Sequence, residues 1–136
     1  MILRTINLYQ PPGGPAPLYT FLDSLDLRLH EKLCWQLFRL ISTPELDMRE
    51  PHIKHFSLEK YRHYYELREK NKILVRIIFT IQDGDILLLA PFVKRQPRDT
   101  VRALEQSSKM LSEIRACPDC MVKFDLAKEV QRMKSR

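Results

Sequence analysis

The chain has 136 residues, of which 44% are hydrophobic and 29% charged; this composition is typical of one globular domain and excludes a disordered or collagen-like chain. No apolar run reaches the roughly 18 residues of a membrane-spanning helix, and the first residues lack a signal-peptide pattern. Three cysteines, an odd number, favour a reduced, cytoplasmic protein. The net charge is +6, and residues 91–136 hold 11 basic and 6 acidic side chains. Such a local excess attracts phosphate polymers, although a solvated lysine-rich helix has the same composition.

The N-terminal third predicts one strand and a helical region. Residues 2–9 alternate apolar and polar side chains around positions 5–8, which indicates a β-strand. Prolines and glycines at 11–15 predict a loop, because proline neither continues a helix nor donates to a sheet. Residues 17–25 then form a short amphipathic turn. It leads into the first long helix of the chain.

That helix is predicted over residues 26–42, where apolar side chains recur every three or four positions. Either Asp23 or Asp26 is expected to cap its N-terminus. We expect Cys34 and Trp35 to pack on its flank. Its buried stripe consists of Leu29, Leu33, Leu37, Leu40 and Ile41.

The middle of the chain predicts an antiparallel meander. Residues 43–60 contain two prolines and no clean period, which indicates a loop with room for one helical turn. Three extended segments follow at 63–69, 73–81 and 86–92, rich in β-branched and aromatic residues. Asp83-Gly84 is a strong hairpin signal between the last two.

The C-terminal third predicts two helices. The first opens in the segment 96–100, with Asp99 or Thr100 as its cap. Its predicted buried stripe consists of Val101, Leu104, Leu111 and Ile114. Cys117 and Cys120 have the spacing of half a zinc site, but there is no second pair, so we interpret them as a turn and expect no metal. A last amphipathic helix covers about 123–134. Strands combined with helices in this order predict an α+β sandwich.

Sequence motifs exclude several enzyme classes and leave two clusters of polar residues. No phosphate-binding loop, dinucleotide-binding glycine pattern, Gly-x-Ser-x-Gly or His-Glu-x-x-His occurs. His52, His55 and His63 lie within twelve residues of each other, where they form either an acid–base group or a solvated loop surface. The second cluster lies on the meander.

The meander combines Glu66 and Arg68 on one strand, Arg76 on the next, and Lys94 and Arg95 directly after the last. Strand pairing brings such residues within reach across a sheet face. They form either cross-strand salt bridges, with Glu66 paired to Arg76, or a cationic face that grips a phosphodiester. Arg76 is the most informative residue, because a charge among apolar strand neighbours needs a partner.

Four segments carry a resemblance to a known family: 21–25, 65–68 (Tyr-Glu-Leu-Arg), 76–79 (Arg-Ile-Ile-Phe) and 87–95. Their order and spacing resemble the RelE/HigB superfamily of bacterial toxins, in its phage-derived HigB-like branch. The resemblance implies a small RelE-like α+β domain, with an antiparallel β-sheet packed on two N-terminal helices. A helix is expected after the last sheet strand, followed by an extra C-terminal helical tail. Residues 1–116 would form the toxin domain and residues 117–136 a helical extension of it.

The same resemblance implies the toxin of a type II toxin–antitoxin system. Such a toxin is a ribosome-dependent endoribonuclease that cuts mRNA in the cytoplasm without a metal or cofactor. The expected partners are the ribosome, mRNA and a helix-turn-helix, HigA-like antitoxin, and no membrane. The alternative is a non-catalytic RNA- or protein-binding relative on the same scaffold.

Site residues follow by position in the matching motifs. Arg76 is similar to the phosphate-gripping arginine of the family, and Lys94 and Arg95 to the basic pair at the end of the last strand. The acid and base are not carried over, because Tyr64 and Glu66 stand where RelE has two lysines. From the residues alone, Glu66, His63 and His55 remain alternatives for the base. The further RNA contacts that we expect are Arg68, Lys54, Arg98 and Arg102.

Overall fold

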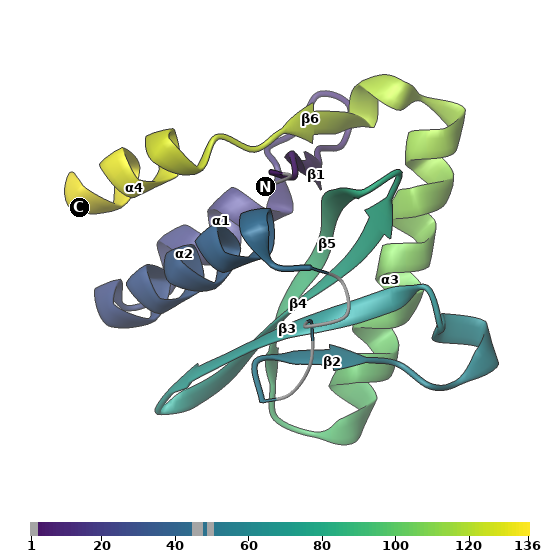
Figure 1. The fold of residues 1–136 in the computed structure, drawn as a ribbon, viewed down its shortest axis with the longest axis horizontal. Helices are drawn as coiled ribbons and strands as arrows, with labels where there is room; N and C mark the ends of the chain where they lie inside the picture. Colours follow the sequence, from purple (N-terminus) through teal and green to yellow (C-terminus); the bar gives the residue numbers. More distant parts are fainter. Residues whose placement is uncertain (1–2, 45–47, 49–50) are drawn as a thin grey trace.

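The protein is a six-stranded, mostly antiparallel sheet with helices on both faces (Figure 1). A computed structural model describes residues 3–44, 48 and 51–136. The described elements are β1 (Ile6–Tyr9), α1 (Pro17–Ser24), α2 (Leu27–Ser42), β2 (Ile53–His55), the 3-10 turn η2 (Glu59–Tyr61), β3 (Tyr64–Asn71), β4 (Ile73–Gln82), β5 (Asp85–Lys94), α3 (Pro97–Ala116), the 3-10 turn η3 (Pro118–Cys120), β6 (Met121–Lys123) and α4 (Leu126–Lys134). The predicted α+β class is confirmed. Of the helices described, none has the length and apolar character to cross a membrane.

The strand order is β2-β3-β4-β5-β1-β6, and β3, β4 and β5 form the predicted antiparallel meander. The turn between β4 and β5 has φ values of 51° at Asp83 and 84° at Gly84, the left-handed backbone that a two-residue hairpin requires. The sheet is not wholly antiparallel, because β1 runs parallel to β5, with Ile6 opposite Ile86. Both residues are buried, so this central pairing keeps their side chains in the core.

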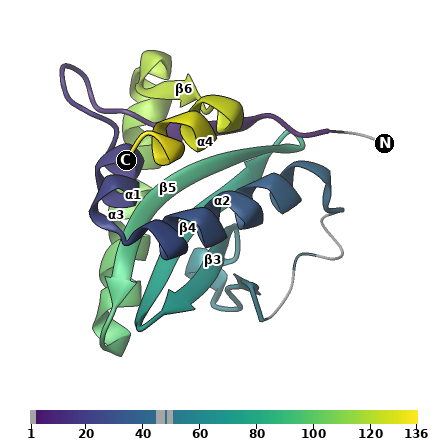
Figure 2. The same cartoon turned by 90° about the vertical axis from the view of Figure 1, so that its left-hand side faces the viewer.

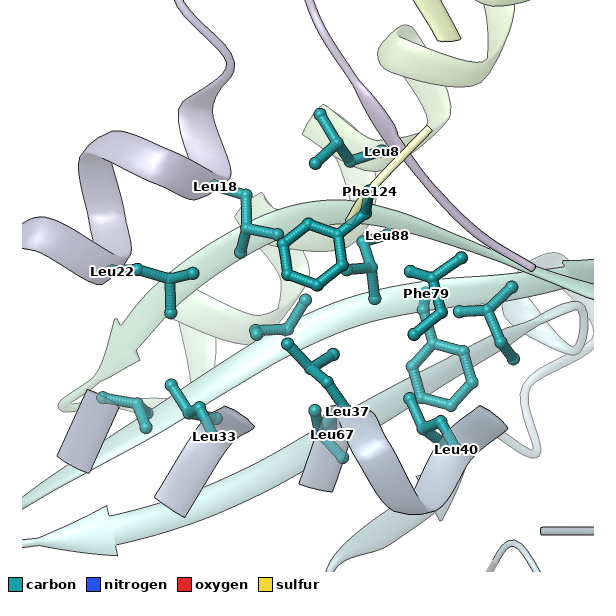
Figure 3. Packing of buried hydrophobic residues seen from close by; sticks show 14 of the residues in the cluster. Leu8, Leu18, Leu22, Leu33, Leu37, Leu40, Leu67, Phe79, Leu88 and Phe124 are labelled. Carbon is teal, nitrogen blue, oxygen red and sulfur yellow. The ribbon is translucent and has the colours of Figure 1, made fainter. Parts of the chain in front are cut away.

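Helices α1 and α2 cover one face of the sheet, and α3 crosses the other (Figures 1 and 2). The α2 stripe packs on alternate residues of the meander, and the cluster includes the fully buried Leu37, Leu67 and Phe79 (Figure 3). Burial of each such side chain contributes about 1.5–3 kcal/mol. On the opposite face Ile78 packs with Leu104 of α3. The meander is therefore covered by α1 and α2 on one face and by α3 on the other. The parts of the second face that lie beyond α3 are not covered by any described helix.

Two helix starts show which of the predicted caps is used. Asp26 caps α2, where its Oδ1 accepts a hydrogen bond of 2.8 Å from the backbone N–H of Leu29. Helix α3 starts earlier than predicted, with Gln96 at the cap and Pro97 in the first turn. Asp99 lies inside that turn, and its Oδ2 accepts the backbone N–H groups of Arg95 and Gln96. A proline in the first turn is favourable because it has no N–H to leave unpaired.

Several sequence predictions need correction. Strand β1 begins at Ile6 rather than at residue 2, which lies outside the described residues, as do 45–47 and 49–50 of the predicted loop. That loop contains the three-residue strand β2, too short for a visible alternation. Trp35 and Val101 were expected to pack, but they are 63% and 47% exposed, because each lies just beside the buried stripe of its helix.

The sequence predicts a purely helical C-terminal extension, and this prediction is wrong. Its first part forms β6, which pairs antiparallel with β1 at the edge of the sheet, and only then does α4 begin. Helix α4 lies beside α2 (Figure 2), held by a hydrogen bond of 3.0 Å between the buried side chains of His30 and Glu129. The extension is therefore built into the same domain.

Candidate functional site

Strands β3 and β4 place Arg68 and Arg76 directly opposite each other, near the turn that joins the two strands. Cross-strand partners share one face of a sheet, and Glu66 lies two positions from Arg68 on that same face. The face is the one that α3 crosses, since Tyr64 of the same row hydrogen-bonds Ser108 of α3. The predicted cross-strand salt bridge between Glu66 and Arg76 is present, and the register adds Arg68 directly opposite Arg76.

One buried carboxylate serves both guanidinium groups. Glu66 is 1% exposed, and its Oε1 accepts a hydrogen bond of 2.9 Å from Nε of Arg68. The Nε atom of Arg76 lies 3.5 Å from the same oxygen, at ion-pair distance. Nη1 of Arg76 donates to the carbonyl of Val75 at 3.0 Å. The three side chains carry a formal net charge of +1 in a largely buried setting.

The electrostatics of Arg76 reflect this arrangement. Burial lowers the pKa of its guanidinium, the Glu66 carboxylate opposes that shift, and neighbouring Arg68 adds to it. An arginine nonetheless stays charged in proteins. Within the part of the chain that the structure describes, Nε of Arg76 and Oε2 of Glu66 have no hydrogen-bond partner. The cluster therefore places two guanidinium groups around one carboxylate, and guanidinium groups are suited to binding an anion.

A groove of about 290 Å³ opens at this cluster. It is lined by His52, Arg68 and Arg76, together with neighbouring residues of β3 and β4. This volume is near the lower end of ordinary small-ligand sites, roughly 300–1,000 Å³. Nδ1 of His52 lies 3.9 Å from Oε2 of Glu69. The groove thus combines two cations that can hold a phosphate with an imidazole that can exchange a proton.

The remaining predicted residues, Lys94 and Arg95 as catalytic groups and Lys54, Arg98 and Arg102 as RNA contacts, are not among the residues that line the groove. Lys54 lies opposite Glu66, and Lys94 lies opposite Leu74 beside Arg76, so both share the face of the cluster. The ammonium of Lys54 is 5.6 Å from the centre of the Phe56 ring. The others, Arg95, Arg98 and Arg102, are exposed around the start of α3 and do not line the groove.

The structure does not bring His63 to this site. His63 directly precedes β3, five positions before Arg68, which is roughly 17 Å along an extended chain. His55 is also elsewhere, with its ring stacked on Tyr65 at 4.5 Å. His52 enters the groove because the N–H of Arg68 donates to its carbonyl at 2.7 Å, beside the β2–β3 pairing. Sequence reasoning noticed the histidine cluster but missed β2, the strand whose register singles out His52.

Comparison of the chain with protein-family models, with curated proteins and with solved structures finds no match. The chemistry of the groove follows from its own residues. Two guanidinium groups present planar N–H donors of the kind that bind phosphate oxygens in pairs. The groove therefore combines donors suited to phosphate oxygens with the imidazole of His52, a group that can exchange a proton.

Proposed function

We propose that this groove binds the phosphodiester backbone of RNA and that the protein is a ribosome-dependent endoribonuclease, the toxin of a type II toxin–antitoxin system. The observation that carries the proposal is the opposed pair Arg68 and Arg76, which line the groove and both contact the buried Glu66. Like charges directly opposite on a sheet are unfavourable. A bound phosphate removes that cost, because it faces both cations at once.

The residues of the groove have separable roles in such a reaction. RNA cleavage of this type uses the substrate's 2′-OH as the nucleophile, so it needs a base and a stabiliser of the charged phosphorane. Arg68 and Arg76 supply the stabilisation. His52 is the group that we assign to the 2′-OH proton. Glu66 is a positioning residue, because its buried carboxylate acts through the two arginines rather than on RNA.

The partners follow from charge and from the family resemblance of the sequence motifs. Lys94 extends the cationic face toward the exposed Arg95, Arg98 and Arg102, which suits an RNA longer than one phosphate. The motifs resemble RelE/HigB toxins, so the ribosome, mRNA and a helix-turn-helix antitoxin are the proposed partners. The proposed location is the cytoplasm, where these partners are found.

One observation favours a second function, RNA binding without cleavage on the same scaffold. Glu66 is engaged by two arginines, and His55 and His63 lie outside the groove, so none of the three side chains expected as bases is placed to act. In the proposed step His52 takes the 2′-OH proton and solvent protonates the leaving 5′-oxygen. If His52 is not a base either, the groove can hold RNA but cannot activate its 2′-OH. The two functions differ in whether bound RNA is cut.

Induced expression separates them. The nuclease should arrest growth and leave mRNA cut within reading frames, and co-expression of a neighbouring helix-turn-helix protein should restore growth. His52→Ala is the matched variant, since it keeps both arginines and removes the proposed base. Growth arrest with intact message, or no arrest, would count against the nuclease and leave RNA binding to be measured on the purified chain.

A further inference from the structure

The turn η3, between α3 and β6, brings two cysteines together. The N–H of Cys120 donates to the carbonyl of Cys117 at 2.9 Å, which closes a turn of four residues. In such a turn the two Cα atoms lie within about 7 Å, and a disulfide spans about 4.4–6.8 Å between Cα atoms. Both thiols are free, and the Cys117 side chain is close enough to contribute to the raised pKa of Cys120. The backbone is therefore already folded in a way that permits a bond between the sulfurs.

The two thiols differ in access. Cys117 is exposed, whereas Cys120 is 2% exposed and faces the cluster under α3. Burial raises the pKa of Cys120, and the contact with Cys117 and the charge of Glu113 add to that shift. Because exchange depends on access, the exposed thiol is the one that can attack a disulfide from solvent, and the buried thiol beside it can then close the bond.

The third cysteine has no such partner nearby in sequence and serves as an internal reference. Cys34 lies in α2, is buried, and has its pKa raised to about 11 by that burial. A buried thiol of high pKa is a poor nucleophile. Over residues 3–44, 48 and 51–136, no group of three or more His, Cys, Asp or Glu side chains is arranged to hold a metal ion.

We propose that Cys117 and Cys120 form a redox-active dithiol that is oxidised to an intramolecular disulfide by low-molecular-weight disulfides. The Cys117 thiolate attacks one sulfur of the disulfide, whose S–S bond breaks and releases one thiol, which takes up a proton. The Cys120 thiol then loses its proton to solvent and attacks the Cys117 sulfur, and the second thiol leaves. Overall the protein loses two hydrogens, and one small disulfide is reduced to two thiols.

The proposed bond lies at the junction of the C-terminal extension. Cys120 is followed directly by β6, and its carbonyl accepts the N–H of Gln10 at 2.8 Å. Because the turn is already closed by its backbone hydrogen bond, oxidation should leave the fold unchanged. The site is independent of the cationic groove and of the function proposed for it.

The test uses the reduced full chain in glutathione buffers of graded oxidation state, trapped by alkylation and analysed by mass and peptide mapping. The expected product is a chain lighter by two hydrogens, with Cys117 and Cys120 joined and Cys34 alkylated only after unfolding. A persistent glutathione adduct on Cys117, a disulfide between two chains, or three free thiols throughout would overturn the proposal. These outcomes are read on the wild-type chain and need no variant.

Three variants then assign the steps. Cys34→Ala should form the same bond at the same rate. Cys120→Ala should stop at the mixed disulfide on Cys117, because the closing thiol is missing. Cys117→Ala should react at least about tenfold more slowly, because both remaining thiols are buried. Equal rates for Cys117→Ala and wild type would mean that Cys117 is not the entry point, which contradicts the proposed order of steps.

Discussion

Arg68 and Arg76 are cross-strand neighbours with like charges, and the carboxylate of Glu66 lies between them in the core of the sheet. Like charges directly opposite each other on a sheet are unfavourable. Arg68 and Arg76 also line a groove, where a bound phosphate would face both cations.

Arg76→Ala should reduce RNA cleavage by about 10²–10³-fold, because one stabilising contact to the phosphorane is lost. The melting temperature should stay within a few degrees, because the hydrogen bond between Glu66 and Arg68 remains and a like-charge contact disappears. Cleavage rate and thermal unfolding are measured on the same preparation. Arg115→Ala, at an exposed position in the last turn of α3, is the control for loss of one charge. Early melting with activity lost in proportion would mean that Arg76 only joins two strands.

Glu66→Gln should destabilise the fold. The substitution keeps the shape of the side chain but removes the negative charge that faces two guanidinium groups, both of them partly exposed to water. We expect the free energy of unfolding to fall by about 1–3 kcal/mol, the usual cost of a poorly satisfied buried polar group. Urea unfolding measures it, with Glu105→Gln on the exposed side of α3 as the control. Equal stability of the two variants would show that the carboxylate does not hold the arginines.

His52→Ala should lower the cleavage rate by about 10²–10⁴-fold, the range for loss of a general base, while RNA affinity stays nearly constant. His63→Ala is the matched control, because it removes the same group from an exposed position outside the groove. Single-turnover cleavage and filter binding separate rate from affinity. Full cleavage activity in His52→Ala, together with loss of cleavage in His63→Ala, would contradict this assignment and identify His63 as the base.

RNA binding should depend steeply on salt. Four cations share the face of the groove, namely Lys54, Arg68, Arg76 and Lys94. If each neutralises one phosphate of a single strand, affinity should fall about 50-fold from 50 to 200 mM salt. Lys94→Ala should reduce the slope of log affinity against log salt by about 0.7. A slope that does not change in this variant would place the RNA elsewhere on the surface.

The fold itself has a test in Asp26, the cap of α2. The pKa of the Asp26 carboxyl lies below its usual value of 3.8. The largest cause of this shift is the hydrogen bond that the carboxylate accepts from the N–H of Leu29. The ionised form is therefore the stabilising one. Its contribution is complete above pH 3.8 and is lost as the pH falls through the folded-state pKa. Asp26→Ala should melt below wild type at pH 7, and the difference should shrink at lower pH. Asp26→Asn, which can still cap, should melt nearer to wild type.

The meander shows how much of the fold the sequence predicts and where prediction ends. The three long strands, α2 and α3 were visible because their apolar periods extend over many residues. Strands β2 and β6 have three residues each, too few for a period, and they form because longer neighbours offer them an edge. The exposed Trp35 shows a related limit, since periodicity identifies the stripe but not how far burial extends beside it.

The site was predicted in part for the same reason. Arg68, Arg76 and Glu66 could be grouped because they lie on long strands joined by short turns. The alternation of side chains does not determine the register that places arginine opposite arginine. A shift of one strand by two residues would leave every side chain on the same face of the sheet. The position of His52 in the groove could not be predicted, because it depends on strand β2, which the sequence pattern does not reveal.

The most direct measurement is cleavage of a defined, end-labelled mRNA on programmed ribosomes by the purified chain, with Arg76→Ala and His52→Ala alongside. We predict fragments that end in a 2′,3′-cyclic phosphate and begin with a 5′-hydroxyl, because the 2′-OH is the nucleophile. Arg76→Ala should bind more weakly and cut about 10²–10³-fold more slowly, whereas His52→Ala should bind nearly as wild type and cut about 10²–10⁴-fold more slowly. Fragments that end in a 3′-hydroxyl, or equal cleavage by wild type and both variants, would contradict an RNA-cleaving site between β3 and β4.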